Sequence, residues 1–179
     1  MISRRGFIKR ALMAVCACRF GGRVPAQPAY ASESTEMSLN MYNIHTGERL
    51  CTTYCSGGCY DENEIDRINH FLRCHYTNRV KSVSLKVIDL LCRIKDRMGC
   101  GKEISIISGY RSPEYNEYLR RLGHHVAAGS LHTAGLAVDF AMADIKTGEL
   151  ARTAKLFSAG GVGTYSDFVH IDVGRVRYW

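Results

Sequence analysis

The chain has 179 residues, with 24 lysine and arginine residues against 17 aspartate and glutamate residues. This length suits one domain that buries a proper core. Six of the basic residues, and none of the acidic ones, lie within the first 31 residues. The remaining chain is nearly balanced in charge and carries no basic stripe with interleaved aromatics, so we expect no nucleic acid as a partner.

The first 31 residues have the composition of an export signal. Residues 3–9 read SRRGFIK, a twin-arginine motif, and a short apolar run and an A-x-A cleavage site follow it. The alternative is a basic amphipathic surface helix. We predict a signal at residues 1–31, a linker at 32–38 and one domain over 39–179. Twin-arginine machinery would then deliver the protein to the periplasm, and no later segment is expected to span a membrane.

Six cysteines follow the predicted signal. An even number in an exported chain favours disulfides, although the sequence does not fix their pairing. The first three are spaced four residues apart, so an alternative is a second metal site with Cys74 or His75 as the fourth ligand. Their spacing differs from the C-x2-C spacing that is usual in such sites, which disfavours this alternative. Free thiols are the third possibility. The six are Cys51, Cys55, Cys59, Cys74, Cys92 and Cys100.

The predicted elements of the first part of the domain begin with a hairpin. Residues 39–44 and 49–54 flank a turn at Gly47. Helical spacing of apolar residues then predicts helices over 62–75 and 84–98. A short strand at 104–107 follows, and a helix over 113–122 starts at a proline.

The second part of the domain alternates strands with one helix. After a loop at 123–129 we expect a strand over 136–142 and a helix over 147–159. Two strands, over 162–165 and 168–173, would close the chain as a hairpin. Short strands mixed with helices indicate an α+β fold with a small, mostly antiparallel sheet.

Two motifs near the C-terminus supply the chemistry. Residues 130–139 read S-x-H-x-x-G-x-A-x-D, and residues 167–172 read DFVHID. A catalytic zinc site typically takes three protein ligands and leaves one position open. His132, Asp139 and His170 fit that number, and Gly135 permits the turn that would bring the first two together.

These motifs resemble those of the zinc D-alanyl-D-alanine peptidase and murein endopeptidase family, in particular a branch exported by the twin-arginine route. Residues 108–112, SGYRS, with Asn116 are similar to that family's substrate-binding segment, and the resemblance spans residues 39–179. It implies helices packed on one face of the sheet and Zn²⁺ in the concave cleft.

The resemblance also suggests roles for residues around the zinc. Related enzymes place an acidic residue three positions before the last histidine, which makes Asp167 the expected general base. Asp172 shares a strand side with His170, so it is either the base or a partner that orients that ring. Arg111 is expected to bind a carboxylate or developing oxyanion. Ser130 would either hydrogen-bond the substrate or hold its loop, and Tyr110 would lie either in the core or on the cleft wall, where it would border the substrate.

We therefore expect a zinc-dependent murein peptidase that acts on peptidoglycan stem peptides or their cross-links. The resemblance favours an endopeptidase. The alternatives are a D,D-carboxypeptidase and a non-catalytic wall-binding module with the same fold. A serine hydrolase is disfavoured because no G-x-S-x-G motif is present.

Overall fold

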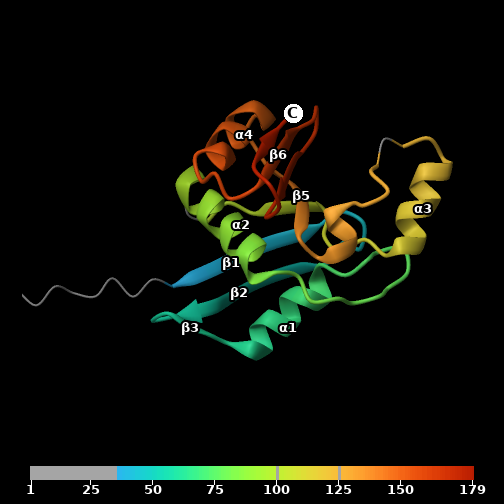
Figure 1. Ribbon diagram of the computed structural model, residues 1–179. Coiled ribbons are helices and arrows are strands. Elements are labelled where there is room, and N and C mark those ends of the chain that lie inside the picture. The colour runs from blue at the N-terminus through green and yellow to red at the C-terminus, as the bar shows by residue number, and fades with distance from the viewer. Residues whose placement is uncertain (1–35, 100, 125) are drawn as a thin grey trace, which may run out of the picture. The chain divides into compact units, whose positions relative to one another are not determined.

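The computed structural model describes residues 36–99, 101–124 and 126–179 (Figure 1). The predicted signal, most of the predicted linker and Cys100 lie outside these residues. The strands are β1 (Met37–Asn43), β2 (Arg49–Ser56), β3 (Cys59–Tyr60), β4 (Ile104–Ser108), β5 (Ala137–Met142), β6 (Gly161–Thr164), β7 (Val169–Asp172) and β8 (Arg177–Tyr178). The helices are α1 (Glu62–Phe71), α2 (Leu85–Met98), α3 (Pro113–Arg121) and α4 (Thr147–Lys155), with a short 3-10 helix η1 (Leu131–Ala134).

The strands form one mixed sheet in the order β3-β2-β1-β4-β5-β7-β6-β8. Most neighbouring strands are antiparallel, and only β1 with β4 and β6 with β8 are parallel. The expected α+β fold with a mostly antiparallel sheet is confirmed. The expected hairpins β1–β2 and β6–β7 are confirmed as well.

One face of the sheet carries the hydrophobic core. Side chains alternate along a strand, so Val138, Phe140 and Met142 of β5 share a face, and all three are buried. Ile171 of β7 is paired with Val138, and Val162 of β6 is paired with Ile171, so both extend this apolar face. Helices α2 and α4 pack over it (Figure 1). The intervening residues of these strands therefore point to the opposite face, where side chains are free for chemistry.

Helices α1 and α2 are joined to the same face of β2 by polar contacts. Thr52 donates a hydrogen bond to Glu64 of α1, and Tyr54, two residues further along the strand, donates to Asp89 of α2. Residues two apart on a strand share a face. The expectation that helices pack on one face of the sheet holds for α1, α2 and α4.

The helix ends follow local side-chain chemistry. Asp61 accepts hydrogen bonds from the backbone amides of Asn63 and Glu64 at the start of α1. Ser112 caps α3 in the same way, directly before Pro113. Helix α1 ends at Phe71, four residues before the predicted end, because the chain closes a tight turn at 74–79 that includes a left-handed Asn78.

Three short elements were not predicted, namely β3, η1 and β8. Strand β8 is two residues long and is held by parallel pairing with β6, a contact that no local pattern reveals. Strand β1 begins at Met37, inside the segment expected to be a linker. Within the described ranges, no helix combines the length and the apolar character needed to cross a membrane.

The five cysteines of the described part of the chain are all free thiols, so the predicted disulfides are not confirmed there. Cys51 and Cys59 are exposed on the β2–β3 hairpin, and the other three are buried. Cys59 pairs with Ser56, five residues along β2 from Cys51. That separation is about 16 Å at the usual rise per residue, far beyond the Cα distance of a disulfide.

Candidate metal centre

Three predicted ligand residues come together on the face of the sheet opposite α2 and α4. Asp139 of β5 and His170 of β7 are directly paired across neighbouring strands. His132 comes from η1, and Gly135 ends that helix with a left-handed φ of 71°. A Cβ at this glycine would lie 2.5 Å from the carbonyl oxygen of Ser82. The turn therefore requires glycine, and it lets His132 return to the strand that carries Asp139.

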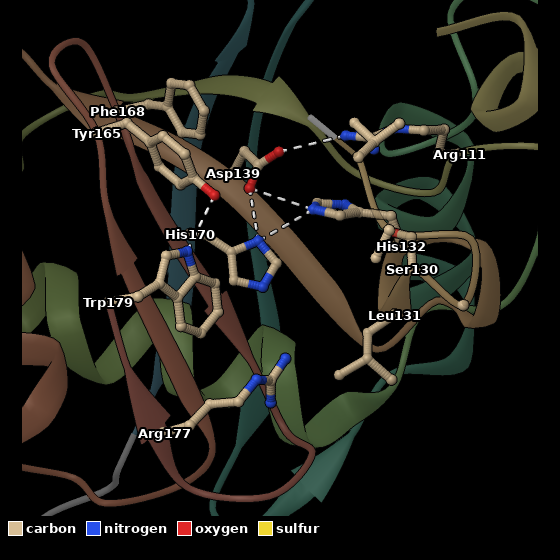
Figure 2. A pocket seen from close by; sticks show the side chains of 13 residues that line it. Arg111, Ser130, Leu131, His132, Asp139, Tyr165, Phe168, His170, Arg177 and Trp179 are labelled. Atoms are coloured by element: carbon tan, nitrogen blue, oxygen red, sulfur yellow. Dashed lines mark hydrogen bonds and ion pairs between the residues drawn. The ribbon is translucent and has the colours of Figure 1, made fainter. Parts of the chain in front are cut away.

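The donor atoms converge on one point, as Figure 2 shows. His132 Nε2 and His170 Nδ1 lie 3.2 Å apart, and each faces Asp139 Oδ1, at 3.1 Å and 2.8 Å. Ligands about 2.05 Å from a tetrahedral zinc ion would be about 3.3 Å from one another. Two imidazoles and a carboxylate at this spacing fit a divalent cation of the zinc type.

Hydrogen bonds on the far side of each ring fix which nitrogen faces the cluster. The carbonyl oxygen of Gly109 can only accept, so His132 Nδ1 donates to it, at 2.8 Å. His170 Nε2 donates to Asp172 Oδ2 at 3.2 Å. These bonds leave His132 Nε2 and His170 Nδ1 for a metal, which is the arrangement that orients histidine ligands in proteins.

The charges of the cluster depend on one another. Burial by itself would raise the pKa of Asp139, but the neighbouring imidazoles of His132 and His170 hold it well below its usual range. Burial opposes protonation of His170, yet the hydrogen bonds to Asp139 and Asp172 raise its pKa. The metal-free centre therefore holds an ionised carboxylate beside a ring that readily takes a proton, and a cation would replace that proton.

Asp172 is fully buried and has several partners on the far side of His170. Its carboxylate accepts from the backbone amides of Gly161 and Gly174 and from the guanidinium of Arg177. Burial opposes ionisation, but these bonds and the His170 ring hold the pKa of Asp172 well below its usual range. Both oxygens are thus engaged away from the cleft, in a position suited to orienting His170.

Asp167 lies in a different environment. It sits in the tight turn between β6 and β7, which the backbone bond from Tyr165 to Phe168 closes. Its side chain is exposed and is not among those that line the cleft. A short polar residue is common in such turns for conformational reasons alone.

Arg111 follows β4 and reaches the cluster from the opposite side to His170 (Figure 2). Its Nη2 lies 3.5 Å from Asp139 Oδ2 and donates to Ser108 Oγ at 3.2 Å. Its Nε is buried without a hydrogen-bond partner among the described residues. Arg111 also lines the cleft, and a guanidinium beside the cluster is suited to bind an anionic or carbonyl oxygen there.

The cluster opens into a cleft of about 400 Å³. Ser130 and the loop at 126–129 form one wall of it. Tyr110 is instead buried in the hydrophobic core and does not line the cleft. The structure therefore gives no support for a substrate contact by Tyr110.

The wall opposite the loop is aromatic and was not predicted. Tyr165, Phe168 and Trp179 line the cleft, with the indole Nε1 donating to Tyr165 Oη at 3.0 Å (Figure 2). The Trp179 ring lies 5.4 Å from that of His170, between centroids. Arg177 lines the same side and holds Asp172. Only the pairing of β8 with β6 brings the C-terminal residues to the cleft, so no local sequence pattern could have predicted this wall.

A buried His–Asp–His cluster with one open side, on the free face of an α+β sheet, places the chain in the class of metal-dependent hydrolases. The family model described as peptidoglycan L,D-endopeptidase MepK matches residues 31–179. The chain belongs to this family.

Curated proteins of the same description are similar over most of their length. The peptidoglycan L,D-endopeptidase MepK of Escherichia coli K12 is 37% identical over 175 residues, which are 96% of each chain. The protein of that name from Shigella flexneri matches equally well. The probable MepK of Haemophilus influenzae is 33% identical over 144 residues, covering 79% of this chain and 77% of its own.

Proposed function

We propose that this protein is a zinc peptidase that hydrolyses peptide cross-links of peptidoglycan; its relatives are named peptidoglycan L,D-endopeptidases. The observation that carries the proposal is the convergence of His132, Asp139 and His170 within bonding reach of one cation, beside a cleft open to substrate. The similarity to named L,D-endopeptidases supports an endopeptidase rather than a D,D-carboxypeptidase.

His132, Asp139 and His170 would hold the zinc ion, which when bound lowers the pKa of a water molecule to about 7 and polarises the scissile carbonyl. Arg111 would bind a substrate carboxylate or carbonyl oxygen with its guanidinium, since it lines the cleft beside Asp139. Ser130 would contact the peptide from the loop wall. Asp172 would keep His170 oriented, since its oxygens are engaged behind that ring.

Asp167 is the remaining candidate for general base, because its position three residues before His170 repeats the spacing of related enzymes. Its exposed place in the turn does not rule it out, since catalytic hydrogen bonds often tighten only with substrate bound. If Asp167 is the base, Asp167→Asn lowers kcat by about 10²- to 10⁴-fold with unchanged metal content. A variant that keeps full kcat would show that Asp167 is only a turn residue.

Digestion of purified sacculi tests the function directly. We expect the zinc-loaded protein to convert cross-linked muropeptide dimers into monomers, as seen after muramidase digestion of the treated sacculi, a chelator to abolish this cleavage, and added Zn²⁺ to restore it. Release of free D-alanine alone, with cross-linked dimers intact, would indicate a carboxypeptidase. Binding to sacculi without any cleavage, even with zinc, would indicate a non-catalytic wall-binding module.

The twin-arginine motif supports export to the periplasm, where peptidoglycan lies. Arg4→Lys together with Arg5→Lys is expected to leave the full-length precursor in the cytoplasm, because that route reads the arginine pair. Fractionation and immunoblotting measure this. Unchanged export of the double variant would contradict the proposed route.

A further inference from the structure

Three tyrosines form a stacked cluster where the segment after α1 meets α3. Tyr115 and Tyr118 are three residues apart on α3 and so project from the same side of the helix. The ring of Tyr76 stacks on both, with centroids 4.7 Å and 5.2 Å away and planes within 16° of parallel. We call Tyr76, Tyr115 and Tyr118 the tyrosine platform.

Two stacked histidines contact the platform at Tyr115. His75 meets the Tyr115 ring edge-on at 4.9 Å, and its Nε2 lies 3.2 Å from Tyr115 Oη. His45 stacks on His75 at 3.9 Å and is fixed by a 3.0 Å contact between its Nε2 and the carbonyl oxygen of Ile107. Because these rings are already ordered, a ligand that stacks on the platform would lose little side-chain entropy on binding.

The outer part of the platform is open. Tyr76 is 55% exposed and Tyr118 is 42% exposed. Beside Tyr118 lies a hollow of about 440 Å³ whose other lining residues include Glu114, Glu117 and Arg121. Flat aromatic rings next to carboxylates and a guanidinium suit a sugar, whose C–H faces stack on rings while its hydroxyls donate and accept hydrogen bonds.

The platform adjoins the metal centre through the start of α3. Arg111 lines the cleft, Ser112 follows it directly, and the Ser112 hydroxyl accepts a hydrogen bond from the Tyr115 amide at 3.2 Å. In peptidoglycan, each stem peptide is joined to an N-acetylmuramic acid of the glycan strand. A stem of three to five residues spans at most about 10 to 18 Å, so a peptide held in the cleft brings its own sugar close by.

We propose that the tyrosine platform binds the glycan strand of peptidoglycan, with N-acetylated hexosamine rings stacked on Tyr76 and Tyr118. The proposal rests on the proposed function, because it takes the sugar to be the one attached to the peptide in the cleft. Its chemical basis is the combination of the exposed side chains of Tyr76 and Tyr118, flanking Glu114, Glu117 and Arg121, and proximity to Arg111.

Two substrates, one with the glycan and one without it, test the proposal. The double variant Tyr76→Ala, Tyr118→Ala is expected to lower kcat/KM on intact sacculi about tenfold, because it removes the stacking faces. Cleavage of cross-linked peptides freed of glycan should stay as in the wild type. Tyr76→Phe with Tyr118→Phe keeps the faces and should keep most of the activity on sacculi. Leu156→Ala, an exposed apolar residue after α4, is the control and should change neither activity.

Equal loss on both substrates would overturn the proposal, because the rings would then support the cleft and not the sugar. Unchanged activity on sacculi would overturn it too. A separate titration uses peptide-free glycan strands and metal-free protein, with tyrosine ring signals followed by NMR. Shifts at Tyr76 and Tyr118 would support glycan binding by the platform even in a protein that cleaves nothing. A protein that cleaves cross-links but shows no such shifts would refute glycan binding by the platform and leave the proposed peptidase function intact.

Discussion

At the scale of single residues, the metal centre depends on hydrogen-bond acceptors that lie behind the two histidine rings and orient them. The ring nitrogens that face the cluster are selected by Gly109 behind His132 and by Asp172 behind His170. The motif S-x-H-x-x-G-x-A-x-D predicts the ligands themselves, because His132 and Asp139 are local in sequence. It could not separate the two roles weighed for Asp172, since those depend on the amides of Gly161 and Gly174 and on Arg177.

Asp172→Asn tests the supporting role through pH. The folded pKa of Asp172 lies below its unfolded value of about 3.9, so its stabilising effect is full above that value and is lost as pH falls through the folded pKa. We expect Asp172→Asn to cost about 1 to 3 kcal/mol at pH 7 in the metal-free protein. The difference from wild type should shrink near pH 3.

Urea unfolding at both pH values measures this difference. Asp66→Asn changes an exposed residue of α1 and is the control, with an expected effect within about 0.5 kcal/mol. A difference between wild type and Asp172→Asn that stays constant with pH would show that the Asp172 carboxylate is not the ionised partner described here.

Arg111→Lys tests the proposed anion contact. Lysine keeps the charge but lacks the planar fork, so we expect KM to rise about tenfold while bound zinc per protein stays near one. Steady-state kinetics on a cross-linked peptide and metal analysis together measure this. Loss of zinc from the variant would instead mean that the contact between Arg111 and Asp139 maintains the metal ligands.

At the scale of elements, the residues that directly follow β6 and β8 build the aromatic wall of the cleft. Trp179 lies flat against Gly163, where an added Cβ would sit 2.7 Å from the indole. The predicted hairpin at 162–173 was correct, but its glycine-rich strand gave no hint that the last residue of the chain would pack on it. That contact needs the parallel pairing of β8 with β6, which places residues 16 positions apart side by side.

Gly163→Ala is expected to displace the Trp179 ring and to raise KM about tenfold, because the cleft loses part of its wall. The strand itself should form, since no left-handed φ is required at this glycine. Gly148→Ala is the matched control. Its added methyl group meets nothing within 4 Å and lies in α4, so it should stabilise the protein by about 0.5 to 1 kcal/mol without altering kinetics.

Thermal unfolding, Trp179 fluorescence and steady-state kinetics distinguish the two glycine variants. A Gly163→Ala protein with wild-type KM and wild-type indole emission would show that the ring can shift without consequence for the cleft.

At the scale of the whole molecule, the thiols follow the sheet and its core. Cys51 and Cys59 are exposed on β2 and β3, whereas Cys55, Cys74 and Cys92 are buried. We expect an alkylating reagent, without reductant, to label Cys51 and Cys59 in the native protein and the three buried thiols only after unfolding. Mass spectrometry of peptides assigns the sites. A described cysteine that labels only after reduction would contradict the free-thiol state.

The sequence by itself determined the α+β class, most elements and the three donor residues, because each depends on local periodicity, capping or a short motif. Only the tertiary structure decided that His170 pairs with Asp139 across two strands, that Tyr110 is in the core, and that Arg177 and Trp179 enclose the cleft. These facts depend on strand order and register. Pairing between distant segments is selected by the packing of the whole sheet, and a short stretch of sequence carries no record of its partner.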